Sequence, residues 1–305
     1  MRNSLYNFIK GSIFVECTLP DKKYGICKTK YTTAEDYCLS KISDQSIATI
    51  IYNNIVEYAI KECDIDYANL DEELCRAIAE NLKYDEEAED KTKLKYGFYG
   101  EVLLYSLLVT LFPTDVLISK GYFYSPLEKG EPKGYDAYHL IQHYDKVELW
   151  FGEAKFRKDY KSPIKEVLAN FSKTTSGQYF TDNILTIVKE SHHISNGKDI
   201  INKLIPITQT WKKNIVISIA EELKKHRADL VYPKMIAYQQ SLKDTYYEGI
   251  KKCVNYIEEQ FNTGEFKVNG SFPIRIFFLF FPVDNVKAVK EQVVKWISEK
   301  KPLIS

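Results

Sequence analysis

Hydrophobic periodicity along the chain predicts a mixed α/β protein. Several segments carry apolar residues every three to four positions, which is typical of amphipathic or buried helices. Other segments are short apolar runs bounded by turn residues, which is typical of strands. The predicted helices cover residues 44–59, 69–82, 98–112, 162–171, 181–190, 245–261 and 286–297, and the predicted strands 12–15, 24–27, 116–124, 235–239 and 274–281, with a hairpin over 133–156.

The hairpin over 133–156 is the most informative segment. Strand-forming residues fill both of its arms, and polar residues interrupt the middle. A hairpin that is symmetric about the Tyr144–Asp145 bond places Asp136 directly opposite Glu153. Directly opposed side chains have Cβ atoms roughly 5 Å apart, and like charges at that distance are destabilising. The predicted register therefore requires a cation close to the two carboxylates.

Lys155 and a divalent metal are the candidate cations. Glu153 and Lys155 share a face of the second arm because side chains alternate along a strand. Carboxylate oxygens suit Mg²⁺, for which Mn²⁺ can substitute. Without metal, repulsion between the carboxylates predicts that Glu153→Ala raises thermal stability. An isolated Glu-x-Lys is more often an exposed ion pair on a strand, and that interpretation stays open here.

The predicted helix at 98–112 is apolar on nearly all sides and should be buried. Glu101 lies in its first turns, where a buried carboxylate needs a partner. One interpretation makes Glu101 a third acidic group of the metal site. The other places it at the helix start, facing water and favoured by the helix dipole. The pattern alone does not decide between them.

These segments together resemble the PD-(D/E)xK nuclease superfamily. The motif reads Gly134-Tyr135-Asp136 followed by Glu153-Ala154-Lys155, with the proline of the family name absent. The run Tyr96–Leu104 resembles the first core helix of that superfamily. From Tyr96 to Lys155 the chain resembles, more specifically, the nuclease subunit of the Hachiman anti-phage defence system.

The resemblance implies a fold, an activity and partners. The fold would be α/β, with a restriction-endonuclease-like core whose mixed central sheet is flanked by helices. The activity would be metal-dependent hydrolysis of DNA, by a deoxyribonuclease gated by a superfamily 2 helicase. The implied metal ligands are Asp136, Glu153, the main-chain carbonyl of Ala154 and Glu101. Lys155 would contact the attacking water and the phosphate and stabilise charge in the transition state.

The acidic stretch at 85–90 suggests a boundary, so we predict three segments. Residues 1–90 would form an N-terminal α/β extension and a candidate partner-docking region. Residues 91–195 would form the nuclease core. Residues 196–305 would form a C-terminal α/β part that packs on the core. The alternative is that the flanking segments simply complete one globular core.

Charge balance limits the nucleic-acid surface. Lys+Arg and Asp+Glu are both 42, so the net charge is zero. A large independent DNA-binding surface would give a basic balance. A locally basic groove stays compatible with neutrality, as does a partner that brings the DNA. Arg157, Lys158 and Lys161 follow the motif and either contact phosphates or form a solvated helix start.

Other motifs add little. The six cysteines contain no C-x-x-C pair and suggest reduced thiols. The longest apolar run, Ile276–Phe281, is too short to span a bilayer, so we expect a cytoplasmic protein with no membrane partner. His192-His193 has no nearby cysteine to complete a zinc set, which favours a surface position. We find no nucleotide-binding P-loop.

Two hypotheses of different classes follow from the sequence. The chain is either a metal-dependent DNase acting as the effector of a two-component defence complex, or a catalytically silent nuclease-fold subunit that regulates a helicase. The acidic motif with its lysine favours the first hypothesis. The zero net charge fits the second somewhat better.

Overall fold

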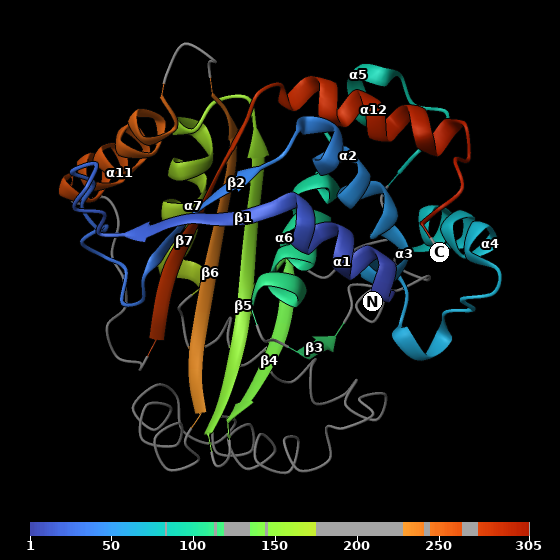
Figure 1. Ribbon diagram of the computed structural model, residues 1–305, viewed down its shortest axis with the longest axis horizontal. Helices are drawn as coiled ribbons and strands as arrows, with labels where there is room; N and C mark the ends of the chain where they lie inside the picture. Colours follow the sequence, from blue (N-terminus) through green and yellow to red (C-terminus); the bar gives the residue numbers. More distant parts are fainter. Residues whose placement is uncertain are drawn as a thin grey trace.

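The strands of the chain form one mixed sheet with helices on both faces (Figure 1). The computed structural model describes residues 1–82, 84–112, 115–118, 135–143, 146–174, 228–240, 245–263 and 274–304. Within these residues the sheet has seven strands in the order β1-β2-β7-β6-β5-β4-β3. The strands are β1 Ile13–Leu19, β2 Asp36–Lys41, β3 Asp115–Ile118, β4 Ala137–His143, β5 Lys146–Arg157, β6 Ala228–Gln239 and β7 Ile274–Val283.

The sheet combines an antiparallel half with a parallel half. Strands β3, β4 and β5 pair antiparallel, whereas β6 runs parallel to β5, β7 runs parallel to β6, and β2 runs parallel to β7. Strand β1 closes the other edge, antiparallel to β2. Parallel strands are covered on both faces and therefore read as nearly continuous apolar runs. Strand β7 has this pattern, and every residue from Ile276 to Val283 is buried.

Helices cover the two faces of the sheet unequally. One face carries a large apolar cluster with side chains from α1, α2, α3, α6 and α12, and the other carries a smaller cluster with side chains from α7 and α11. Figure 1 shows the same division. The helices are α1 Asn3–Ser12, α2 Asp44–Asn53, α3 Ile55–Ala59, η1 Glu62–Asp64, α4 Leu70–Arg76, η2 Ala77–Asn81, α5 Asp90–Lys93, α6 Phe98–Leu111, α7 Lys161–Thr174, α11 Tyr246–Asn262 and α12 Val286–Ser298.

Several helix boundaries confirm the sequence prediction through their capping residues. The Ser43 hydroxyl accepts a hydrogen bond from the amide of Ser46 at the start of α2, and Thr245 accepts one from Glu248 at the start of α11. A side-chain acceptor satisfies an amide that has no partner within the helix. Helix α6 matches the predicted buried helix almost to the residue.

Three sequence predictions about the elements are wrong. The predicted strand at 24–27 is a turn beside a single bridge between Asp21 and Ile26. Helix α1 was not predicted, although Leu5 and Ile9 lie one turn apart on its buried face. The predicted helix over 44–59 is interrupted at Asn54, where α2 ends and α3 begins. The helix near Pro163 starts at Lys161. The predictions for 119–134, 144–145, 181–193, 196–197 and 215–225 lie outside the described residues.

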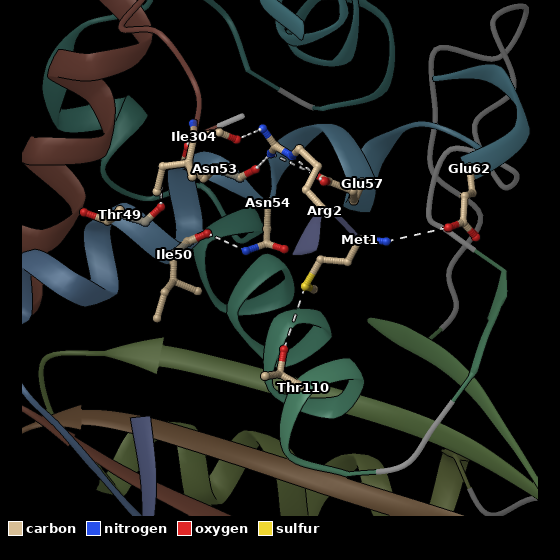
Figure 2. A network of polar contacts seen from close by, with 10 residues as sticks. All are labelled: Met1, Arg2, Thr49, Ile50, Asn53, Asn54, Glu57, Glu62, Thr110 and Ile304. Atoms are coloured by element: carbon tan, nitrogen blue, oxygen red, sulfur yellow. Dashed lines mark hydrogen bonds and ion pairs between the residues drawn. The ribbon is translucent and has the colours of Figure 1, made fainter. Parts of the chain in front are cut away.

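Arg2 holds the first helix to two distant parts of the chain (Figure 2). Its guanidinium donates to both carboxylate oxygens of Glu57 in α3, at 2.8 and 3.2 Å. It also donates to the carbonyl of Asn53 and, at 2.5 Å, to the carbonyl of Ile304. Arg2 and Glu57 are both buried. A buried charge is tolerated when it is paired and hydrogen-bonded, and this pair meets both conditions.

All three predicted segments contribute to the sheet. Strand β2, from residues 1–90, pairs with β7, and β7 pairs with β6, both from residues 196–305. Strand β6 in turn pairs with β5, which carries the Glu153-Ala154-Lys155 motif. The boundaries near residues 90 and 195 stay a prediction. Among the described helices, none combines the length and the apolar character that crossing a bilayer requires.

Candidate functional site

The β4–β5 hairpin has the register that the sequence predicts. Ala137 pairs with Gly152 and Tyr138 with Phe151, which places the centre of the hairpin between residues 144 and 145. The regular ladder ends one pair before Asp136 and Glu153. The amide of Asp136 still donates to the carbonyl of Gly152 at 2.9 Å. The backbone register therefore agrees with the predicted placement of Asp136 opposite Glu153, and the contacts of their side chains differ.

Asp136 is held against the backbone of the motif. Its Oδ2 accepts a hydrogen bond from the amide of Ala154 at 2.8 Å, and its side chain is half-buried. In an extended strand the N–H and C=O groups of one residue point to the same side. The carbonyl of Ala154 therefore faces the side of β5 on which Asp136 lies.

Glu153 is buried under helix α7 and pairs with a residue of strand β6. Its Oε2 accepts a hydrogen bond from the ammonium of Lys234 at 2.9 Å, and its Oε1 accepts one from the amide of Asn170 in α7 at 3.2 Å. Lys155 lies 3.5 Å from Oε1. Burial raises the pKa of Glu153, but the charges of Lys234 and Lys155 and the hydrogen bonds outweigh that effect, so the net pKa is below its ordinary value.

Lys234 is a residue beside the motif that the sequence analysis missed. It is the direct partner of Glu153 in the β5–β6 ladder and has no exposed surface. The apolar pattern of β6 begins at Met235 in the sequence prediction, one residue after Lys234. A lysine inside an apolar run is unusual because burying an unpaired ammonium is unfavourable, and this was the available signal.

The pairing with Lys234 overturns the predicted effect of Glu153→Ala. The sequence analysis predicts that this change raises stability by removing repulsion from Asp136. In the structure the carboxylate of Glu153 bonds to Lys234 and to Asn170, so the change leaves a buried ammonium without its counter-ion. Removing one member of a buried pair is strongly destabilising. We therefore expect Glu153→Ala to lower thermal stability.

Lys155 reaches the surface while Lys234 does not. The side chain of Lys155 is 20% exposed and lies 3.9 Å from Glu166 of α7 as well as near Glu153. Its ammonium is therefore the accessible cation at the motif. Beyond it, Arg157 is half-buried, and Lys158 and Lys161 are exposed. These positions fit both of the interpretations that the sequence analysis leaves open.

Helix α6 brings Glu101 to the opposite face of β5. A Cβ added to Gly100 would lie 3.5 Å from the Cβ of Ala154, so the first turn of α6 lies directly on the motif. Glu101 is half-buried in this turn and accepts a hydrogen bond from the hydroxyl of Tyr58 in α3. The carboxylate is thus at the helix start and also has a partner inside the protein.

Tyr58 connects the surroundings of Glu101 with those of Asp136. A cavity of about 10 Å³ is lined by Tyr58, Tyr105, Asp136 and His139, together with neighbouring residues of β4. This volume holds about one water molecule. Tyr58 belongs to the N-terminal segment, and no motif in the sequence predicts its role.

The predicted site residues therefore lie at three places around Ala154. Glu153 and Lys155 lie on the α7 face, Asp136 lies at the strand end beside Ala154, and Glu101 lies on the α6 face. Among the residues that the structure describes, no three His, Cys, Asp or Glu side chains are close enough to hold a metal together. Mg²⁺ is commonly held by one or two carboxylates with waters and substrate phosphates, so the donor types fit that ion.

His139 gives this region a measurable pH dependence. Burial lowers the pKa of His139 to about 3, compared with an ordinary value of 6.5. As the pH falls below 6.5 the unfolded chain takes up the proton and the folded protein does not, so stability is lost. Between pH 7 and pH 5 this contributes a loss of about 2 kcal/mol. In urea unfolding, His139→Gln should show a smaller loss over this interval, and an unchanged loss would contradict the assignment.

The comparison with protein families assigns the chain. The model of the family HamA matches residues 13–297, which is nearly the whole length. The chain belongs to the HamA family. HamA is a component of the Hachiman antiviral defence system, so the family match confirms the resemblance to a Hachiman protein. A search of the curated proteins and a search of the solved structures each found no match.

The family match covers both predicted flanks of this HamA protein. It begins at the first residue of β1 and ends within α12, so it includes α2, α3 and α4 of the N-terminal segment and strand β7, while α1 precedes it. Tyr58 and Lys234 lie inside the matched range together with the motif residues. The match therefore concerns all seven described strands and, apart from α1, the described helices on the two faces of the sheet.

Proposed function

We propose that this HamA protein is a metal-dependent DNA nuclease, the effector of a two-component anti-phage defence complex gated by a superfamily 2 helicase. The observation that best supports this proposal is the hydrogen bond from the Ala154 amide to the Asp136 carboxylate, at the start of β4 and next to Glu153 and Lys155. This contact places the Asp136 carboxylate beside Ala154, whose neighbours in the chain are Glu153 and Lys155. Membership of the HamA family supports the link to a defence complex.

The order of the elements supports a PD-(D/E)xK core. Helix α6 is followed by β3, β4 and β5 as an antiparallel meander, then by α7 and by β6, which is parallel to β5. The acidic residues lie where β4 begins and where β5 leaves that meander. This is the place at which the sequence resemblance puts the active site of such nucleases.

The donor set fits a hard divalent cation. Asp136, Glu153 and the carbonyl of Ala154 would hold Mg²⁺ or Mn²⁺, and Glu101 would act directly or through a bound water. Water and DNA phosphate would take the remaining positions. The low pKa of Glu153 keeps this carboxylate ionised at neutral pH. When bound, the cation supplies a Lewis acid that neutralises charge on the scissile phosphate.

The other residues would orient the reactants. The accessible ammonium of Lys155 would donate hydrogen bonds to the attacking water and to a phosphate oxygen, where negative charge grows in the transition state. Tyr58 would hold the carboxylate of Glu101 in place. Asn170 and Lys234 would hold the carboxylate of Glu153.

Plasmid cleavage by the purified protein, alone and co-expressed with its helicase partner, tests the proposal. We expect nicking or linearisation that depends on MgCl₂ or MnCl₂ and stops with EDTA. Size-exclusion chromatography of the same preparation tests the complex. A preparation that holds the helicase and leaves supercoiled, linear and single-stranded DNA intact in both metals would contradict nuclease activity.

The second candidate function is a catalytically silent subunit that regulates the helicase. The observation that favours it is the pairing of Glu153 with two lysines, which balances its charge without a metal. In this case the protein would change the ATPase rate or the DNA affinity of the helicase while cleaving nothing. Glu153→Gln would leave that regulation intact.

A further prediction concerns Arg157, Lys158 and Lys161, which follow the motif along the surface. If these cations contact phosphates, replacing all three by Gln should weaken DNA binding equally for unrelated sequences. The slope of log K against log[salt] should then fall by about one unit per lost contact. Fluorescence anisotropy at several salt concentrations measures this slope. An unchanged slope would assign the three residues to a solvated surface.

A further inference from the structure

We propose that Lys234 is a positioning residue of the metal site: it holds Oε2 of Glu153 so that only Oε1 is presented to a divalent cation. The inference rests on the proposed function, since it concerns how the same site would take its metal. It assigns a role to a buried lysine on β6, far in the sequence from the motif.

The first support is the asymmetry of the two carboxylate oxygens. Oε2 is 2.9 Å from Lys234, whose side chain has no exposed surface. Oε1 is 3.2 Å from Asn170 and 3.5 Å from Lys155, and Lys155 is 20% exposed. The shorter contact therefore joins Oε2 to a fully buried ammonium. The longer contacts are those of Oε1, and one of them is made by the partly exposed Lys155.

The second support is the enclosure around the ammonium of Lys234. Its Nζ lies 5.9 Å from the centre of the Tyr135 ring and 5.7 Å from the centre of the Tyr232 ring. Aromatic faces at this distance attract a cation, and the rings limit where the ammonium can move. Tyr135 directly precedes Asp136 in the chain, so one wall of this enclosure comes from the segment that carries the first acidic residue of the motif. The ammonium is thus fixed in position, which fixes Oε2 in turn.

The third support is the position of Lys234 in the sheet. It pairs directly with Glu153 in the parallel β5–β6 ladder, which keeps the two side chains in register. A ligating carboxylate that is itself hydrogen-bonded keeps its orientation, and loss of such a partner typically weakens metal binding by 10–100-fold. A lysine that served only as a counter-ion would have the opposite effect, because its removal would leave a more negative site.

A Mn²⁺ titration followed by electron paramagnetic resonance tests this role without requiring catalysis. Free Mn²⁺ gives a signal that is lost on binding. We expect Lys234→Met to bind Mn²⁺ about 10–100-fold more weakly than the wild-type chain. Lys234→Gln should lie between the two, because its amide keeps a hydrogen-bond donor; it also serves as the measured variant if Lys234→Met does not fold.

Lys290→Met is the matched control. Lys290 is also a buried lysine facing aromatic rings, but its ammonium donates to the carbonyl of Leu94. This variant should lose stability while keeping the Mn²⁺ affinity of the wild-type chain. Equal or tighter binding by Lys234→Met or Lys234→Gln would overturn the positioning role and leave the proposed function standing. A wild-type chain that binds no Mn²⁺ would overturn both the positioning role and the metal-dependent activity.

Discussion

Glu153→Gln and Lys155→Met are each expected to reduce DNA cleavage by at least about 100-fold, the effect of removing one group that stabilises transition-state charge. Glutamine keeps the shape of Glu153 and removes the charge that would hold a cation. Methionine keeps the apolar stem of Lys155 and removes the accessible ammonium. Rates measured on plasmid in the presence of Mg²⁺, with the helicase complex as the enzyme, give the comparison.

The two variants differ in their expected effect on stability, which separates loss of chemistry from loss of fold. Glu153→Gln leaves the buried ammonium of Lys234 without a counter-ion, so its Tm should fall. Lys155 is partly exposed, so Lys155→Met should leave the Tm nearly unchanged. Glu291→Gln and Lys287→Met alter an exposed pair on α12 and serve as controls. Wild-type cleavage rates in both motif variants would rule out the assigned site.

Breaking the buried pair between Arg2 and Glu57 is expected to lower the free energy of unfolding by about 3–5 kcal/mol. Either Arg2→Met or Glu57→Gln leaves a charged or polar group buried with part of its hydrogen bonds lost. The double variant should cost less than the sum of the single variants, because neither residue then has an unpaired partner. Urea unfolding of the four proteins measures the coupling.

The exposed pair of Lys295 and Glu299 on α12 is the control for this cycle. Its side chains are 62% and 55% exposed and 3.8 Å apart. Exposed pairs contribute about 0–1 kcal/mol, so its removal should have little effect. If Arg2→Met and Glu57→Gln matched this control, the contact with Ile304 and the pair itself would add nothing to the stability of the fold.

Local sequence was sufficient for the parts of the site that are close together in the chain. The sequence analysis assumed a hairpin symmetric about the Tyr144–Asp145 bond, and the pairing of the two described arms has the register that this symmetry gives. Helix α6 is apolar on nearly every side, and this pattern fixed both its type and its extent. The pairing of β5 with the parallel strand β6 joins segments that are far apart in the sequence, so local pattern does not predict it.

Lys234 and Tyr58 could not be placed from local pattern. Lys234 is separated from Glu153 by 81 residues, and Tyr58 is separated from Glu101 by 43. The partners of these residues depend on how whole elements meet, namely the register of β6 on β5 and the contact of α3 with α6. A sequence shows the types of these side chains and not the pairs that they form. The sequence analysis predicted a cation beside Glu153 and named Lys155. It missed Lys234, whose ammonium lies closer to the carboxylate.

The hydrogen bond from Tyr58 to Glu101 has a consequence for any attempt to reduce this protein to a minimal catalytic fragment. A fragment cut at the predicted boundary near residue 90 would keep Glu101, Asp136, Glu153 and Lys155 and would satisfy every motif search. It would also lack the tyrosine that anchors the first of them and the strand β2 that covers the edge of β7. The unit that the proposed activity requires is therefore larger than its sequence signature, and the signature alone is a poor guide for choosing the ends of a fragment.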